Sequence, residues 1–190
     1  MLASLGRPDD ALAAYQVACE RYDLALRIKP DKHEARFNLS LALEQQGWLL
    51  AAAGAWPEAI QALERADAER SALAPERPLL GWHYYRRWFI RRHRADAEAI
   101  QCLQRVLSMG REELARDNAV GGYCNLGLFL LANGQEDNAL ALYRQALEEG
   151  ASQSDIAQAC IELGALGALL GPEVVAKARL LLDESAPSPH

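Results

Sequence analysis

Small residues recur along this chain at fixed spacings, and those spacings restrict the fold more than any other feature. Gly134 follows Gly127 after seven residues, and Ala139 follows Gly134 after five. Tyr143 and Ala146 then stand four and seven residues beyond that alanine. Two antiparallel helices pack closely only where a small residue on one admits a bulky side chain from the other. The segment therefore predicts a hairpin of two closely packed helices.

The same spacings recur, in whole or in part, in four other segments. These contain Gly6, Ala11, Tyr15 and Ala18; Gly54, Ala59, Leu63 and Ala66; Ala99, Leu103 and Val106; and Gly164, Gly171, Ala176, Leu180 and Asp183. The third of them has Arg94 where the others have a glycine. A glycine five residues before the alanine would lie in the turn between two helices, where it adopts a left-handed backbone without a Cβ clash. We therefore expect consecutive helical hairpins along the chain.

The composition also favours helices. Thr is absent, and Val and Ile together supply 11 of the 190 residues, whereas Ala, Leu, Glu, Gln and Arg dominate. The dominant residues lose little side-chain freedom in a helix. No run of residues alternates between apolar and polar with the period of two that a half-buried strand requires. The sequence therefore predicts an all-α fold.

The repeated pattern resembles the tetratricopeptide repeat. The stretch ALRIKPDKHEARFNLSLAL resembles the junction between repeats in bacterial members of that family. In this junction Pro30 would end one helix, and Asp31 with Glu34 would cap the next. The resemblance covers residues 2–184 and implies a right-handed superhelical solenoid of antiparallel helix-turn-helix units.

The predicted units differ in length. We expect a single solenoid over residues 1–184, with units at about 1–30, 31–75, 79–110, 118–151 and 155–184, and a disordered tail over 185–190. Ala11, Ala59, Ala99, Ala139 and Ala176 are 48, 40, 40 and 37 residues apart, against the roughly 34 residues of this repeat. The longest spacing equals one repeat plus two insertions of seven residues, each about two helical turns. It predicts one long hairpin over residues 9–28 and 32–53.

The ends of the predicted solenoid are uncovered. Only the residues MLASL represent the first helix of the first unit, and a solenoid that begins in this way leaves apolar surface unburied. We expect either that the natural chain is longer or that the exposed ends self-associate.

The resemblance also points to candidate binding residues, because in this family the first helix of each unit lines a concave groove. Asn38 in FNLSLA and Asn125 in CNLGLF occupy equivalent positions on such helices. The resemblance implies that both face the groove and bind the backbone of a peptide, since an amide both donates and accepts hydrogen bonds. The alternative is that both bond only within the scaffold. Phe37 and Leu41 stand where the carboxylate-clamp version of the family has Lys and Asn, so that version is not expected.

The segment GWHYYRRWFIRRHR, residues 81–94, carries five Arg and five aromatic residues. Because Arg94 replaces the turn glycine, its helical phase is ambiguous by one residue. One phase directs to the groove Tyr84, Trp88, Arg91 and Arg92. The other packs Trp82, Tyr85 and Phe89 inward and directs to the groove Arg87, Arg91 and Arg94. We prefer the second phase, since the first would bury Arg86 and Arg87.

An arginine stripe beside aromatic rings suits an acidic peptide, a C-terminal carboxylate or a phosphate group, through charge-assisted hydrogen bonds. It also suits single-stranded RNA, although the formal net charge of -6 opposes nonspecific nucleic-acid binding. The alternative is a solvated face whose arginines pair with acidic neighbours. The candidate partner-binding residues are Asn38, Asn125, Arg87, Arg91, Arg94, Tyr84 and Trp88.

The sequence carries no signal for catalysis, a metal or a cofactor. His33, His83 and His93 are isolated, the four cysteines form no CxxC pair, and no nucleotide-binding or nucleophile motif occurs. Widely spaced cysteines are typical of a reducing compartment, and no segment reaches the roughly 18 apolar residues of a membrane span. We therefore expect a cytoplasmic protein.

Together these patterns favour a non-enzymatic scaffold that binds a peptide or partner protein in a concave groove, either on its own or as the sensor or adaptor segment of a larger bacterial protein. The alternatives are a solenoid that binds nucleic acid through residues 81–94 and a purely structural or oligomerising segment.

Overall fold

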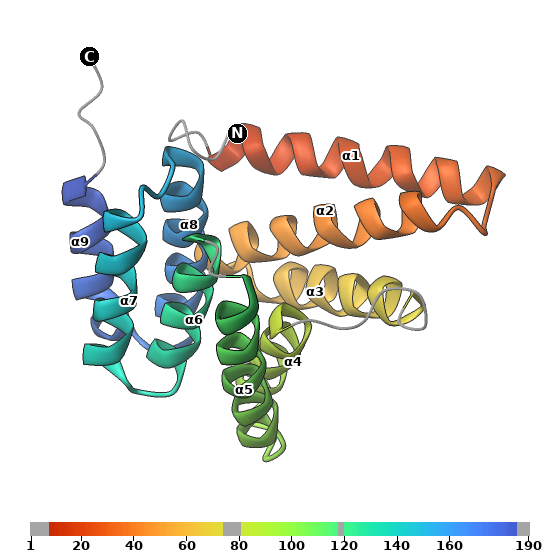
Figure 1. Cartoon of the computed structure of the whole chain (residues 1–190). Helices are drawn as coiled ribbons and strands as arrows, with labels where there is room; N and C mark the ends of the chain where they lie inside the picture. Colours follow the sequence, from red (N-terminus) through yellow and green to blue (C-terminus); the bar gives the residue numbers. More distant parts are fainter. Residues whose placement is uncertain (1–7, 74–80, 118–119, 186–190) are drawn as a thin grey trace.

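The computed structural model describes residues 8–73, 81–117 and 120–185, and every regular element in these ranges is helical (Figure 1). The all-α prediction is therefore confirmed for this part of the chain. No helix within it is long and apolar enough to cross a membrane. Gly6 and most of the predicted tail, residues 186–190, lie outside the described ranges.

The helices follow one another through short connections and pack in consecutive pairs. They are α1 (Pro8–Ile28), α2 (His33–Ala52), α3 (Trp56–Ser71), α4 (Gly81–His93), α5 (Ala99–Asp117), α6 (Val120–Ala132), α7 (Glu136–Glu148), α8 (Gln153–Leu170), the 3-10 helix η2 (Pro172–Val174) and α9 (Ala176–Ser185). The pairs are α2 with α3, α4 with α5, α6 with α7 and α8 with α9, and α1 packs along α2.

The predicted long hairpin is present as α1 and α2, and its ends agree with the prediction to within one residue (Figure 1). The predicted capping pair of Asp31 and Glu34 is wrong, because Lys32 precedes α2 and no side chain caps this helix. A side chain further along α2 stabilises the turn instead. Arg36 Nη2 donates a hydrogen bond to the Pro30 carbonyl oxygen over 3.1 Å.

Small residues bring the paired helices together, at Gly127 as the pattern predicts and at Gly47, which precedes Gly54 by the same seven residues. A Cβ atom on Gly47 would lie 2.6 Å from Leu63 Cγ, and one on Gly127 would lie 3.0 Å from Tyr143 Cε2. Ala139, the alanine that follows Gly127 and Gly134 in the pattern, is fully buried. The pattern predicts close packing at Gly127, and the structure adds that Leu63 and Tyr143 are the bulky residues that meet the two glycines.

Two of the predicted turn glycines adopt the left-handed backbone. Gly54 and Gly134 have left-handed φ angles of 79° and 73°. In the turn between α4 and α5 this conformation falls on Ala95, with φ 55°, one residue after Arg94. Helix α4 therefore ends one residue later than the other patterns predict, and its side chains are rotated by one position relative to them.

The spacing predicted for the last hairpin is wrong. Leu180 is 59% exposed, whereas Val175, Ala178 and Leu182 are buried. The reason is that η2 lies between α8 and α9 and shifts the start of α9 along the chain. The close approach is then made by Gly167, where a Cβ atom would lie 2.8 Å from Val175 Cγ2.

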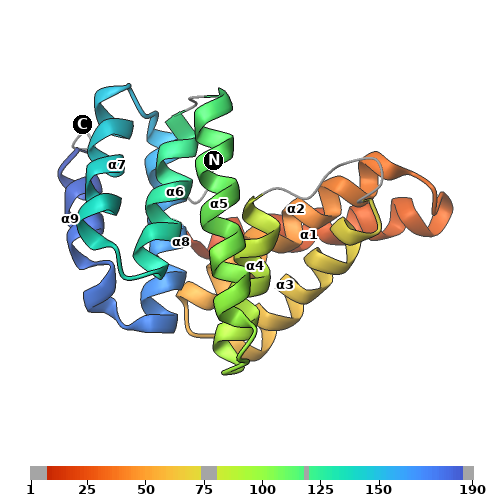
Figure 2. The same cartoon turned by 60° about the horizontal axis from the view of Figure 1, so that its bottom comes forward.

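Helix α2 also contacts α8, although the two are far apart in sequence. A Cβ atom on Gly164 of α8 would lie 3.3 Å from the Cβ of Ala52 at the end of α2. The hairpin of α1 and α2, with α3, thus projects to one side of a block formed by α4 to α9 (Figures 1 and 2). The first helices of the pairs converge where α2 meets α8.

Aromatic side chains from α2, α4 and α6 fill the space where these helices converge. The rings of Trp48 and Phe89 meet edge to face with centroids 4.9 Å apart, and those of Tyr85 and Phe129 lie 5.1 Å apart. Such pairs contribute about 0.5–1.5 kcal/mol each beyond the burial of their area. The middle of the expected groove is therefore part of the hydrophobic core.

Candidate binding pocket

Beside this aromatic core, a pocket of about 300 Å³ opens between α2, α3, α4, α6 and α8. Its volume is at the lower end of the range for small-ligand sites, which suits a side chain or a short peptide segment. The residues that line it are Phe37, Ser40, Leu41, Glu44, Gln45, Trp48, Arg70, Trp82, His83, Asn125, Gln158 and Glu162. Leu41, which is 45% exposed, lies at its mouth.

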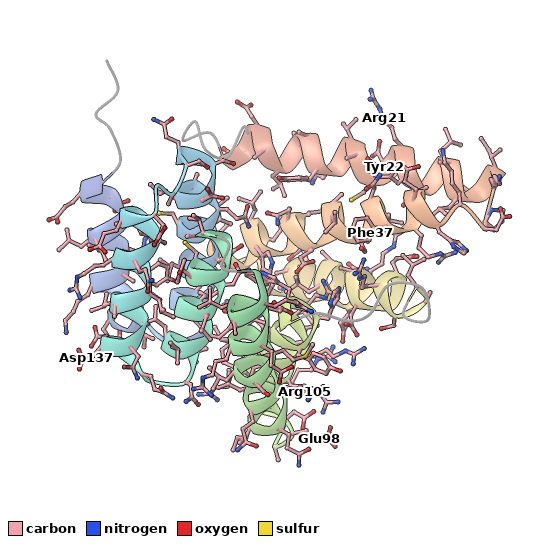
Figure 3. The ribbon with its side chains drawn as sticks, in the orientation of Figure 1. Arg21, Tyr22, Phe37, Glu98, Arg105 and Asp137 are labelled. Atoms are coloured by element: carbon pink, nitrogen blue, oxygen red, sulfur yellow. The ribbon has the colours of Figure 1, made fainter. Side chains whose placement is uncertain are left out.

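Aromatic rings form one wall of the pocket. The rings of Trp48 and Trp82 lie 6.3 Å apart at a tilt of 57°, and Trp48 is held on its other side by Phe89. Phe37, labelled on α2 in Figure 3, has the guanidinium carbon of Arg70 4.6 Å from its ring centroid. The wall is therefore apolar, and the partly exposed Trp82 ring offers a π face that can accept a cation or a flat apolar group.

Glu162 is the most unusual group in the pocket. It is 6% exposed, and its Oε1 accepts a hydrogen bond from Gln158 Nε2 over 2.6 Å. No cationic side chain of the described residues forms an ion pair with it. Burial raises the pKa of Glu162 to about 8; the Gln158 hydrogen bond opposes this increase and the nearby charge of Glu44 adds to it. The carboxylate is therefore a buried acid without a counter-ion.

Glu44 differs from Glu162 because it has a cationic partner. Arg86 Nη1 lies 2.7 Å from Glu44 Oε2, and Arg86 Nη2 lies 3.6 Å from Asp67 Oδ1. Burial raises the pKa of Glu44, and the Arg86 charge and hydrogen bond oppose that increase. Because Arg86 is fully buried, these two carboxylates stabilise a charge that would otherwise be costly to bury.

The two predicted asparagines do not share this pocket. Asn125 lines it from α6. Asn38 is half-buried on α2 and is not among the lining residues, although its neighbour Phe37 is. Phe37 and Leu41 line the pocket, at the two positions that the family resemblance assigned to the groove.

Neither phase proposed for residues 81–94 describes α4 in full. Tyr85 and Phe89 pack inward as the preferred phase predicts, but Arg86 is also completely buried. The burial is possible because Glu44 and Asp67 supply counter-charges from α2 and α3, which the sequence pattern of α4 does not reveal. Trp88 is 2% exposed and belongs to the core, so it is not part of any binding surface. Tyr84 is half-buried.

The arginine stripe faces α3 and not the pocket. Arg87, Arg91 and Arg94 line a separate hollow of about 480 Å³ together with Glu64, Asp67 and Asp96. Arg87 Nε lies 3.0 Å from Asp67 Oδ2, and Arg94 Nη1 lies 2.6 Å from Glu64 Oε1. Arg91 Nη1 lies 2.9 Å from Asp96 Oδ2 and also pairs with Glu98. All three guanidinium groups thus have carboxylate partners.

The residues that sequence reasoning missed are Glu162, Glu44, Trp48 and Gln158. One signal was available: from Ile156 to Leu170, Glu162 is the sole charged residue of an otherwise apolar or neutral helix. An isolated acid in such a run is expected to be buried and therefore to need a partner. The positions of Glu44 and Trp48 depend on how α2 packs against α4 and α8.

Comparisons with family models, with curated proteins and with solved structures each found no match to this chain. Among the described residues, no group of three or more His, Cys, Asp or Glu is placed to hold a metal ion. The pocket between α2, α4, α6 and α8 is therefore the feature from which a function can be argued.

Proposed function

We propose that this chain is a tetratricopeptide-like scaffold that binds a peptide segment of a partner protein in the pocket between α2, α4, α6 and α8. The observation that carries this proposal is the origin of the lining residues. Each of the four helical pairs contributes its first helix to the pocket, and the first helix is the one that lines the groove in such repeats. The pocket also offers aromatic walls and amide groups to a bound chain.

Several features support a repeat architecture of the right-handed superhelical kind. The glycine contacts with Leu63 and Tyr143 occur in two units, α2 with α3 and α6 with α7, as do the left-handed turns at Gly54 and Gly134. The contact of α2 with α8 differs from an extended array, in which each unit touches only its neighbours. The contact of α2 with α8 shortens the proposed groove to a pocket. Such a pocket favours the binding of a single anchoring side chain over that of a long helix.

The ion pairs of the arginine stripe argue against the two partners that would bind there, an acidic peptide and a nucleic acid. A phosphate or an acidic peptide would have to displace the carboxylates already bound to Arg87, Arg91 and Arg94. The formal net charge of -6 adds to that cost for nucleic acid. We therefore place partner binding at the pocket and not at the stripe.

A structural or oligomerising role remains the second candidate because of the outer face of α1. Val17, Leu24 and Ile28 are exposed there at helical spacing. Arg21 points away from the molecule between them, whereas Tyr22 lies between α1 and α2 (Figure 3). Light scattering over a range of concentrations distinguishes this role, since a monomer at all concentrations excludes it.

The proposal includes a cytoplasmic location and a sensor or adaptor role within a larger bacterial protein. All four cysteines are free thiols, two of them buried, which supports a reducing compartment.

Selection from a random peptide display library on the immobilised chain tests the proposed function. Peptides that bind through the pocket should lose at least tenfold in affinity on Leu41→Arg, which places a bulky charge at its mouth. Leu180→Arg is the matched control, because Leu180 is an exposed leucine on α9, away from the pocket. If no peptide is enriched, or if the enriched peptides bind Leu41→Arg as well as the wild type, the proposal is wrong.

A further inference from the structure

We propose that the pocket accepts a cationic group, the ammonium or guanidinium of a Lys or Arg side chain on the bound peptide, with the Glu162 carboxylate as its counter-ion. This inference rests on the proposed function and adds the chemistry of the anchoring side chain. It departs from the acidic partner that the arginine stripe suggested in the sequence.

The first argument is the missing counter-ion of Glu162. A buried carboxylate without a cationic partner is costly, and the usual solutions are an ion pair or protonation. Within the described residues Glu162 accepts one hydrogen bond, from an uncharged amide. Its side chain lines the pocket, so an entering cation can reach it. The positive charge that Glu162 lacks within the protein is therefore the one that a cationic ligand would supply.

The second argument is that the other acid of the pocket already has its partner. Glu44 is paired with Arg86, and Arg86 also approaches Asp67. Of the two carboxylates in the pocket, Glu44 is paired within the protein and Glu162 is not. We therefore assign Glu162 as the partner of a cationic ligand. Trp82, which is partly exposed and packs against the buried Trp48, adds an aromatic face on which an ammonium or guanidinium group can rest.

Arg70 is a cationic residue of the protein that also lines the pocket. Its guanidinium lies over the Phe37 ring, and its charge lowers the pKa of Glu44. No such effect of Arg70 acts on the pKa of Glu162. Arg70 therefore occupies the Phe37 end of the pocket and does not neutralise Glu162.

Titratable groups from five helices surround Glu162. Glu44 stands on α2, Tyr85 on α4, Cys124 on α6, Tyr143 on α7 and Cys160 on α8, and Glu162 interacts electrostatically with each of them. The pKa values of Tyr85 and Tyr143 are raised well above their usual range and that of Cys124 to about 12, chiefly by burial. These three groups are uncharged at neutral pH. His83 also lines the pocket.

This arrangement links binding to a proton. Because the pKa of Glu162 is raised to about 8, the free protein carries a proton there at neutral pH. A cation favours the charged carboxylate, so binding below pH 8 must release that proton. The affinity should therefore rise with pH between 6 and 8 and level off above that, up to roughly tenfold per pH unit.

The test uses the full chain and the peptides enriched by display. Lys or Arg should be enriched at one position, and replacing it by norleucine should weaken binding at least tenfold. Glu162→Gln should cause a loss of similar size at pH 8.5 and a smaller one at pH 6, where wild-type Glu162 is already uncharged. Glu148→Gln, which changes an exposed acid on α7, is the matched control. Calorimetry in two buffers of different ionisation enthalpy should detect a released proton for the wild type only.

The outcomes separate this inference from the proposed function. If pocket-dependent peptides are enriched but contain no basic residue, or bind Glu162→Gln normally at pH 8.5, the cationic anchor is wrong while the scaffold proposal stands. If cadaverine alone binds as tightly as the peptide, the site belongs to a free amine and the peptide-borne cation is wrong. Circular dichroism should show that Glu162→Gln is folded, because a glutamine replaces a protonated acid.

Discussion

The guanidinium of Arg86 and the carboxylate of Glu44 form a buried ion pair, with 2.7 Å between Nη1 and Oε2 and with Arg86 0% exposed. Replacing Arg86 by Leu would leave Glu44 buried without its partner, which costs about 3–5 kcal/mol. Urea denaturation should show this loss at pH 8 and a smaller one as the pH falls, because burial raises the pKa of Glu44 and makes it easier to protonate. Arg94→Leu is the control, since its partner Glu64 is exposed and such pairs contribute about 1 kcal/mol or less.

Glu162 should make the protein less stable as the pH rises. Its pKa is about 8 in the folded state and roughly 4.3 when unfolded. Between these values the folded state holds a proton that the unfolded state has lost, so the free energy of unfolding falls with pH, by at most ~1.4 kcal/mol per unit. Glu162→Gln should remove this slope and exceed the wild type in stability at pH 8. Equal slopes for the two proteins between pH 5 and pH 8 would contradict the raised pKa.

Close packing at Gly47 makes α2 sensitive to a single methyl group. A Cβ atom there would lie 2.6 Å from Leu63 Cγ, so Gly47→Ala should destabilise the protein by about 1–3 kcal/mol. The penalty should shrink in a Leu63→Ala background, because that variant vacates the space. Gly121→Ala is the control: a Cβ atom there meets no described atom within 4 Å, and alanine favours the helix. Thermal melts of the four variants measure these differences.

Ala95 adopts a left-handed backbone, which is unfavourable for any residue with a Cβ atom. Ala95→Gly should therefore stabilise the protein by about 0.5–1 kcal/mol, since the relief of strain exceeds the entropy that glycine gains when unfolded. Gly134→Ala, in the equivalent turn, should shift the melting temperature in the opposite direction. A lower melting temperature for Ala95→Gly would show that the turn has no such strain.

The four thiols should react at different rates in the folded protein. The pKa of Cys124 is raised to about 12 by burial, so almost none of it is thiolate at pH 8. Cys102 and Cys160 are only partly buried. Mass spectrometry after brief iodoacetamide treatment should find these two alkylated before Cys124, and all four alkylated in urea.

The helical pairs could be predicted from the sequence because their contacts are local. Gly127 and Tyr143 belong to neighbouring helices, and the glycine, the turn and the bulky residue recur at spacings fixed by helical geometry. The pattern failed where the turn changed: Ala95 takes the conformation expected one residue earlier, and η2 moves the last hairpin out of register. Neither change can be predicted from the spacing of small and apolar residues in the sequence.

The candidate site was predicted less well, because its parts meet only through contacts between distant helices. Asn125 was found from its place in the pattern, and it does line the pocket. Arg86 was expected to avoid burial, since the acids that pair with it stand on two other helices. For the same reason the stripe of Arg87, Arg91 and Arg94 resembled an open binding surface.

The contact between α2 and α8 also bears on how the chain unfolds. In an array where each pair touches only its neighbours, the terminal pairs can fray while the middle stays folded. Here Ala52 and Gly164 join the early and late parts of the chain, so neither part can detach without exposing the aromatic core. The two parts should melt together in one cooperative transition, and folding should be slowed by closing so long a loop.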